Sequence, residues 1–128
     1  MATEYEIISM INRTTTSINS LKNNKTKYQN MNNKINDAIS KLGSSKQNIA
    51  NAYQGLKKNY IGTIANRKAT ELQTEQAEIE RAITQLKNIL SASSKRINTI
   101  NTQITNKQNE RQYLYQKLYE VRARGNNV

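Results

Sequence analysis

The sequence contains no proline, cysteine, tryptophan, phenylalanine or histidine. Because proline is the residue that a helix interior tolerates least, its absence permits very long helices, and only four of the 128 residues are glycine. Without cysteine no disulfide can form, so cysteine usage carries no information about the redox compartment. Hydrophobic residues make up 35% of the chain, and its aromatic residues are all tyrosine. The composition therefore favours a thin seam between helices over a wide globular core.

The missing residue types also remove the commonest catalytic groups. Histidine and cysteine are the usual bases, nucleophiles and metal ligands, and neither is present. Four of the nine acidic residues cluster at Glu71, Glu75, Glu78 and Glu80, without the loop geometry of a calcium site. The four glycines are scattered, so there is no glycine-rich phosphate loop. We therefore expect a protein that is not an enzyme and has no metal or cofactor.

The chain also lacks long uncharged segments. No stretch approaches the roughly 20 apolar residues that a membrane-spanning helix needs, so we expect no membrane insertion. The first residues, Met1-Ala2-Thr3-Glu4-Tyr5-Glu6, are acidic and lack the basic start and apolar run of a conventional signal peptide. We expect a cytoplasmic protein, which only a route without such a leader would export.

An apolar stripe with alternating steps of three and four residues runs through both halves of the chain. In the first half it comprises Ile11, Ile18, Leu21, Tyr28, Ile35, Ile39, Leu42, Ile49, Tyr53, Leu56 and Tyr60. In the second half it comprises Leu72, Ile79, Ile83, Leu86, Leu90, Ile97, Ile100, Ile104, Leu114, Leu118 and Val121. The average step of 3.5 is that of a supercoiled helix seam. Because one helix cannot bury such a stripe, the sequence predicts an all-α fold, a long antiparallel two-helix coiled-coil hairpin.

The predicted hairpin is a single domain, residues 1–128, with helix one at about 4–60, a turn near 61–63 and helix two at about 64–124. Thr3 and Glu6 resemble a capping box at the start of helix one. Gly62 suits the left-handed residue that ends a helix, and Thr63 can cap helix two. Residues 125–128 should fray.

Gly43-Ser44-Ser45 is the weakest part of helix one, because a glycine costs about 1 kcal/mol in a helix interior. The stripe stays in phase across this segment, from Leu42 to Ile49, so we interpret it as a kink or short interruption. An alternative, a helix that stays straight through Gly62 and dimerises, also remains open.

The predicted register pairs apolar with apolar residues. If the turn centres near Gly62, facing residues have numbers that sum to roughly 125, so that Leu42 faces Ile83 and Ile11 faces Leu114. The seam also contains polar positions, which cost stability but fix register. These are Lys25, Asn32, Lys46, Gln76, Ser93, Lys107 and Arg111.

The net charge is +11, and it is unevenly spread. Between Ile7 and Thr70 a single acid, Asp37, stands among eleven lysines and arginines. The cluster at residues 71–80 should lie near Lys46, Lys57 and Lys58 as ordinary solvated pairs. The basic surface permits electrostatic binding of nucleic acid or of an acidic protein. Nucleic acid is the less favoured partner, because no known DNA-binding helix motif is present.

Several large side chains fall off the stripe, where they are available for contacts. Tyr5 and Tyr119 should lie side by side and close the open end of the seam, whereas Tyr113 and Tyr115 favour a contact surface. A second hairpin could cover the other off-stripe residues in a four-helix bundle. These are Ile8, Met31, Ile61, Ile64 and Ile89.

The segment Tyr60-Ile61-Gly62-Thr63-Ile64-Ala65-Asn66 resembles the WXG turn of the small helical hairpins of type VII secretion, with tyrosine in place of tryptophan. The wider stretch from Ala52 to Leu72 is similar to the longer hairpins encoded beside LXG-class toxins, in which an Asn-Lys or Asn-Arg follows the turn. Here Asn66-Arg67 occupies that place. The resemblance in architecture extends over the whole chain, but the specific motif extends over only about a dozen residues. We find no Tyr-x-x-x-Asp/Glu export signal near the C-terminus.

The resemblance implies a non-catalytic targeting partner or chaperone that binds the helical N-terminal region of an LXG toxin. It assigns the turn motif to Tyr60 and Gly62, and it implies that a second small hairpin could join the complex. Export by type VII secretion is part of the same expectation. Two alternatives stay open: a self-associating structural coiled coil, such as a homodimer, and a basic nucleic-acid-binding protein.

Overall fold

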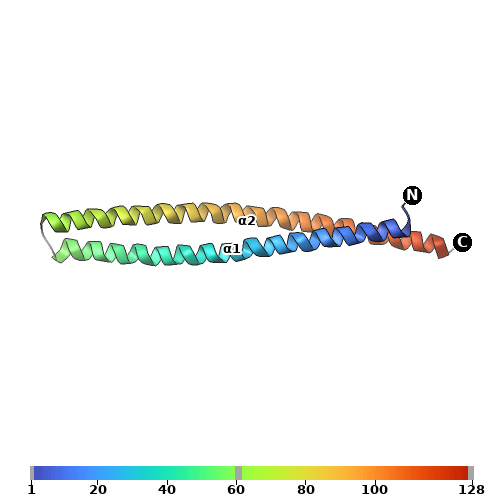
Figure 1. Ribbon diagram of the computed structural model, residues 1–128, viewed down its shortest axis with the longest axis horizontal. Helices are drawn as coiled ribbons and strands as arrows, with labels where there is room; N and C mark the ends of the chain where they lie inside the picture. The colour runs from blue at the N-terminus through green and yellow to red at the C-terminus, as the bar shows by residue number, and fades with distance from the viewer. Residues whose placement is uncertain (1, 60–61, 127–128) are drawn as a thin grey trace. The chain divides into compact units, whose positions relative to one another are not determined.

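The computed structural model describes residues 2–59 and 62–126, and these form two helices (Figure 1). Helix α1 spans Glu4–Asn59, 56 residues, and helix α2 spans Thr63–Asn126, 64 residues. The described residues contain no strand. The all-α fold class predicted from the sequence is therefore confirmed.

Thr3 caps the start of α1. Its carbonyl accepts the N–H of Ile7 at 3.0 Å, and its hydroxyl accepts the N–H of Glu6 at 3.2 Å. This is the N-cap role predicted for Thr3. The reciprocal half of the capping box, a bond from the Thr3 N–H to the Glu6 carboxylate, does not form among the described residues. Glu4 and Glu6 in the first turn and Lys57 and Lys58 in the last turn both complement the helix dipole.

α1 continues through Gly43-Ser44-Ser45 as an α-helix. The short interruption that the sequence allows at this segment does not form, because the heptad spacing of Leu42 and Ile49 holds both turns in one helix. A bend at Gly43 stays a prediction.

Gly62 stands at the start of α2. Its carbonyl accepts the N–H of Asn66 at 3.0 Å, and its φ of 129° lies in a region that favours glycine. The predicted roles therefore shift by one residue: Gly62 occupies the N-cap position of α2, and Thr63 is its first helical residue. Tyr60 and Ile61, which the sequence places at the turn, lie outside the described residues.

α2 extends two residues beyond the predicted end at Arg124, through Gly125 to Asn126. A glycine weakens a helix without terminating it, and helix ends commonly shift by one or two residues. The fraying expected from residue 125 onward is therefore wrong for Gly125 and Asn126.

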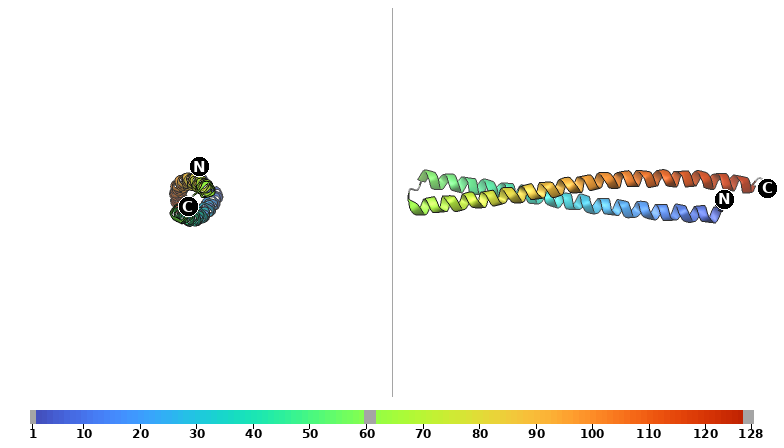
Figure 2. Two further views of the ribbon diagram at one scale, coloured as in Figure 1. Left: turned by 90° about the vertical axis from the view of Figure 1, so that its left-hand side faces the viewer. Right: turned by 90° about the horizontal axis from the view of Figure 1, so that it is seen from above.

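The two helices together form two compact units. Unit 1 joins Met1–Gln29 of the first half with Ser94–Val128 of the second, and unit 2 is Asn30–Ser93. In unit 1 the described parts of α1 and α2 lie side by side (Figure 2).

Unit 1 contains most of the fully buried side chains. A cluster of Ile7, Ile11, Leu114 and Leu118 forms one part of its core, with Ala2, Ile8 and Val121 packed against it. Ile18 and Ile100 are each only 1% exposed. All of these except Ala2 and Ile8 follow the three-four spacing of the apolar stripe. Burying an isoleucine fully contributes about 1.5–3 kcal/mol, so this seam is the main source of stability in unit 1.

Two contacts fix the pairing of the helices in unit 1. The Arg122 guanidinium donates to the Glu4 carboxylate at 2.8 Å, and Arg111 donates to the Thr15 hydroxyl at 3.3 Å. In both contacts the two residue numbers sum to 126, against the roughly 125 expected for facing residues. The start of α1 thus pairs with the end of α2 in this unit.

Unit 2 has a thinner core. Among its described residues, Ile35, Ala69 and Ser93 are buried, whereas the other described residues of the apolar stripe are half-buried. Lys46 forms an ion pair with Glu80, and the Gln73 amide donates to the Tyr53 hydroxyl at 3.0 Å. These two contacts also join residues whose numbers sum to 126.

Candidate partner-binding surface

The structure divides the predicted contact residues between the two units. Ile8, Tyr113, Tyr115 and Tyr119 belong to unit 1, whereas Met31, Ile64 and Ile89 belong to unit 2. Of the residues at the predicted turn motif, only Gly62 is described, and it is exposed. The candidate residues of each unit are therefore described by the geometry of that unit alone.

An isoleucine and three tyrosines lie on and next to one side of unit 1. The Glu4–Arg122 and Thr15–Arg111 bonds cross between the helices on this side. Residues three or four positions from these four residues lie on the same side, because such residues are neighbours on a helix surface. Ile8, Tyr115 and Tyr119 meet this spacing, and Tyr5 lies three residues before Ile8 on α1. We call these four residues the tyrosine flank.

The side chains of the tyrosine flank are accessible. Tyr5 is 81% exposed and Tyr119 77% exposed, and Tyr115 is about half exposed. Ile8 is half-buried because it packs against the Ile7 cluster. The expectation that Tyr5 and Tyr119 close the end of the seam is therefore wrong. Off-stripe positions point them outward, and Ala2 and Val121 pack there instead.

Tyr113 lies on another side of α2. It stands two residues before Tyr115, a spacing that places side chains on different faces of a helix. The Lys117 ammonium lies 5.4 Å from the centre of the Tyr113 ring, a cation–π contact that covers part of its face. The three C-terminal tyrosines thus divide into a pair on the tyrosine flank and one residue elsewhere.

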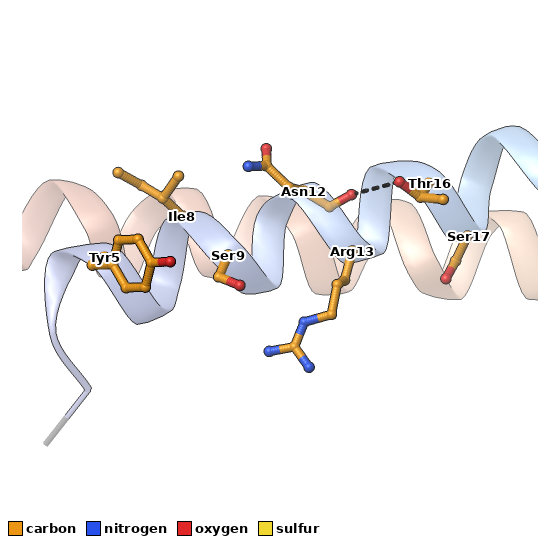
Figure 3. A pocket seen from close by; sticks show the side chains of 7 residues that line it. All are labelled: Tyr5, Ile8, Ser9, Asn12, Arg13, Thr16 and Ser17. Atoms are coloured by element: carbon orange, nitrogen blue, oxygen red, sulfur yellow. Dashed lines mark hydrogen bonds between the residues drawn. The ribbon is translucent and has the colours of Figure 1, made fainter.

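A shallow groove of about 550 Å³ opens on α1 beside the tyrosine flank (Figure 3). Tyr5 and Ile8 line one end, and the small side chains of Ser9, Thr16 and Ser17 leave the rest hollow. Its other lining residues are Asn12 and Arg13. In Figure 3, Ile8 and Asn12 point to one edge and Arg13 to the opposite edge. The sequence pattern did not single out Arg13 or the groove, although the run of small residues at 14–17 was a visible signal.

Two threonine hydroxyls of this region donate hydrogen bonds to backbone carbonyls of α1 itself. Thr16 donates to the carbonyl of Asn12 at 3.0 Å, and the buried Thr14 donates to the carbonyl of Met10 at 2.9 Å. Such bonds satisfy the hydroxyl groups locally. The Arg13 guanidinium, by contrast, forms no ion pair with any described residue, so it is the charged group that the groove offers to a ligand.

The charges of unit 1 are strongly unbalanced. The unit contains eleven lysines and arginines against four glutamates. Glu4, Glu110 and Glu120 are each bound by a lysine or arginine of the same unit. Among the described residues, six of its cations form neither an ion pair nor a side-chain hydrogen bond: Arg13, Lys22, Lys25, Lys27, Lys95 and Arg96. Unit 1 therefore presents a positive potential with few internal counter-charges.

The contact candidates of unit 2 are isolated from one another. Ile64 is 77% exposed near the start of α2, Ile89 is about half exposed, and Met31 is half-buried. Single exposed apolar residues are common on proteins and define no site by themselves. We therefore base no binding surface on these three residues.

The acidic cluster of unit 2 is only partly paired. Glu80 binds Lys46 as expected, and Glu71 is bound by Lys68, three residues earlier in α2, at 3.2 Å. Lys57 instead lies 5.2 Å from the centre of the Tyr53 ring. Lys58 forms no ion pair with a described residue. The cluster therefore consists of ordinary exposed pairs, each of small energetic value.

The polar seam positions predicted from the sequence are all at least half-buried. Lys46, Lys107 and Arg111 have polar partners, whereas two short side chains of unit 2 do not. The Asn32 side-chain oxygen and the Ser93 hydroxyl oxygen are both buried without a hydrogen-bond partner in the structure. A buried polar group without a partner costs about 1–3 kcal/mol, so this part of the unit 2 seam is weakened.

Neither helix contains, within residues 2–59 and 62–126, a segment apolar enough to cross a membrane. The same residues bring together no group of three or more acidic side chains that could hold a metal ion. No family model matches the chain, and no curated protein or solved structure matches it either. The function of the chain therefore has to be inferred from its own surfaces and charges.

Proposed function

We propose that the chain is a non-catalytic partner protein that binds the helical N-terminal region of a type VII-secreted LXG-class toxin, as a targeting factor or chaperone. In this proposal it acts as a helical hairpin whose turn contains Tyr60 and Gly62. It packs helix against helix with the toxin, in a bundle that a second small hairpin could complete. The chain acts in the cytoplasm and could leave it with the toxin by type VII secretion.

One observation carries most of the proposal. Two helices of 56 and 64 residues share heptad spacing, yet large side chains remain exposed outside their seams. Tyr115 and Tyr119 lie on one side of unit 1 and Tyr5 lies next to Ile8 beside it, and tyrosine is enriched where proteins bind one another. The resemblance at Tyr60-Ile61-Gly62 supplies the class of partner, and the physical features supply the mode of binding.

The test is co-expression of the full chain with the LXG region of a toxin encoded beside it, followed by purification at measured stoichiometry. A defined complex and a higher yield of soluble toxin region are expected. A combined change of Tyr60→Ala and Gly62→Ala should weaken the complex, and Gly43→Ala is the matched control. If both proteins are recovered separately and the toxin yield is unchanged, the proposal fails.

A self-associating coiled coil is the second candidate, and the thin core of unit 2 favours it. Its half-buried stripe residues could be covered by another copy, as in a four-helix bundle. Sedimentation equilibrium of the isolated chain separates the two candidates. A stable dimer or tetramer at low concentration, with no binding to the LXG region, would favour self-association.

A further inference from the structure

We infer that the tyrosine flank of unit 1, with the adjoining groove on α1, docks an acidic amphipathic helix of a partner protein. This inference rests on the proposed function for the role of the complex, and it adds the surface and the chemistry of the partner. The flank comprises Tyr5, Ile8, Tyr115 and Tyr119, as defined above.

The shape of the surface suits a helix. Tyr5 and Ile8 belong to both the flank and the groove, so the two form one continuous surface. Ser9 and Thr16 are small, which allows another backbone to approach α1 closely. Large apolar rings beside a hollow are typical of the centre of a protein interface, where tyrosine contributes contact area and one hydrogen bond.

The charge of the surface selects an acidic partner. Unit 1 carries eleven cations and four acids, and Arg13 at the edge of the groove has no ion pair. A carboxylate on the flank of a docked helix would give Arg13 the partner that it lacks, in a charge-assisted hydrogen bond. Complementary charge also raises the association rate of the two proteins.

The same charges argue against a second copy of the chain and against nucleic acid as the occupant of this surface. A second copy placed with its unit 1 on this surface would bring like charges together, which costs free energy. A nucleic acid strand needs cations along its backbone beside the stacking rings. Beside the rings of the tyrosine flank, however, Arg122 is already bound to Glu4, which leaves it unavailable to a phosphate backbone.

The experiment measures binding of three labelled probes to the full chain by fluorescence anisotropy at low salt. One probe is a synthetic helical peptide with a leucine stripe flanked by glutamates, and the second has the same stripe flanked by lysines. The third is a single-stranded oligonucleotide. We expect the glutamate peptide to bind at least about tenfold more tightly than either other probe, because only it complements both the rings and the charge.

Variants then locate the binding surface. Tyr115→Ala with Tyr119→Ala should weaken binding of the glutamate peptide by about tenfold or more, as is typical of central aromatic residues. Tyr113→Ala is the matched control, because Tyr113 has a similar exposure on a different side of the same helix. Arg13→Glu should weaken binding further. Circular dichroism checks that each variant keeps its helix content.

The outcomes are decisive in each direction. Equal binding of the two peptides, tighter binding of the oligonucleotide, or an equal loss in Tyr113→Ala would overturn the inference. A complex with the LXG region that the Tyr115 and Tyr119 changes leave intact would overturn the inference and keep the proposed function. Glutamate-peptide binding at the tyrosine flank with no LXG complex would keep the inference and remove the proposed function.

Discussion

Unit 1 and unit 2 share the same heptad spacing but bury their seams to different extents. Among the described residues, eight side chains are buried in unit 1, and three are in unit 2. Both units contain polar seam positions, so polarity alone does not explain the difference. The size of the seam side chains explains the difference in burial.

In unit 1 the polar seam residues are mostly long. Lys107 and Arg111 bury aliphatic stems along the seam and reach Glu110 and Thr15 with their charged ends. In unit 2 the fully buried seam residues include Ala69 and Ser93, which fill little space. Short side chains leave neighbouring apolar residues half-exposed, since packing depends on filling the space between helices.

The comparison teaches that periodicity sets which residues face the seam, whereas side-chain volume sets how well the seam is buried. It also assigns different properties to the units. Unit 1 is the better-packed platform for an exposed binding surface, and unit 2 is the region whose seam opens more easily. Four measurements test this difference, from the largest expected effect to the smallest.

The largest effect should come from truncating the deepest seam residue. Ile100→Ala in unit 1 should lower the free energy of unfolding by about 2–5 kcal/mol, because it creates a cavity where the side chain is 1% exposed. Ile83→Ala in unit 2 should cost roughly half as much, since Ile83 is only half-buried. Urea unfolding followed by circular dichroism measures both. Equal losses would contradict the difference in packing.

Gly62→Ala should destabilise the chain by about 1–2 kcal/mol, because φ of 129° is strained for any residue with a Cβ atom. Gly43→Ala is the control, with the opposite sign. Gly43 lies inside α1 with open space around it, so alanine should stabilise the helix by about 0.5–1 kcal/mol. Thermal unfolding of both variants provides the measurement, and a shift in the same direction for both would refute this account of Gly62.

Ser93→Ala should stabilise unit 2 by about 1 kcal/mol, because it removes a buried hydroxyl that has no partner. Ser94→Ala is the control for helix propensity, which favours alanine at both positions by a few tenths of a kcal/mol. Hydrogen exchange of amides in residues 30–40 and 85–93 should slow in the Ser93 variant only. Loss of stability in that variant would show that the hydroxyl has a role in the seam.

The smallest effects should come from the ion pairs that cross between the helices. Double-mutant cycles of Glu4 with Arg122 in unit 1 and of Lys46 with Glu80 in unit 2 should each give a coupling of about 0.5 kcal/mol or less. All four side chains are more than a third exposed, and solvent screens such pairs. A coupling above about 1 kcal/mol in unit 2 alone would mean that the pair compensates for its thin core.

The sequence predicted the fold class and much of the local detail. Thr3 caps α1 as expected, and the polar seam positions are at least half-buried. Local rules succeeded here because capping and heptad spacing depend on near neighbours in the chain. They were wrong by one residue at Gly62, because a glycine between two helices can either end the first or cap the second. They also failed at Gly125, because the low helix propensity of glycine is a weak signal for a helix end.

The candidate surface was predictable only in part. The spacing of Tyr115 and Tyr119 identified side chains outside the stripe, and both are exposed. The sequence also placed Tyr5 beside Tyr119, but it did not reveal that Arg13 borders a groove, since this depends on which side of α1 meets α2 in unit 1. The turn residues Tyr60 and Ile61 and the identity of the partner stay predictions.

The sequence by itself determined that the chain is helical, which residues face the seam and how much positive charge the surface carries. These properties follow from periodicity and composition, which are local or additive. Only the tertiary structure decided how deeply each seam position is buried and which off-stripe residues share a side. Both depend on the volumes and contacts of side chains far apart in sequence, such as Glu4 and Arg122, and local patterns do not encode them.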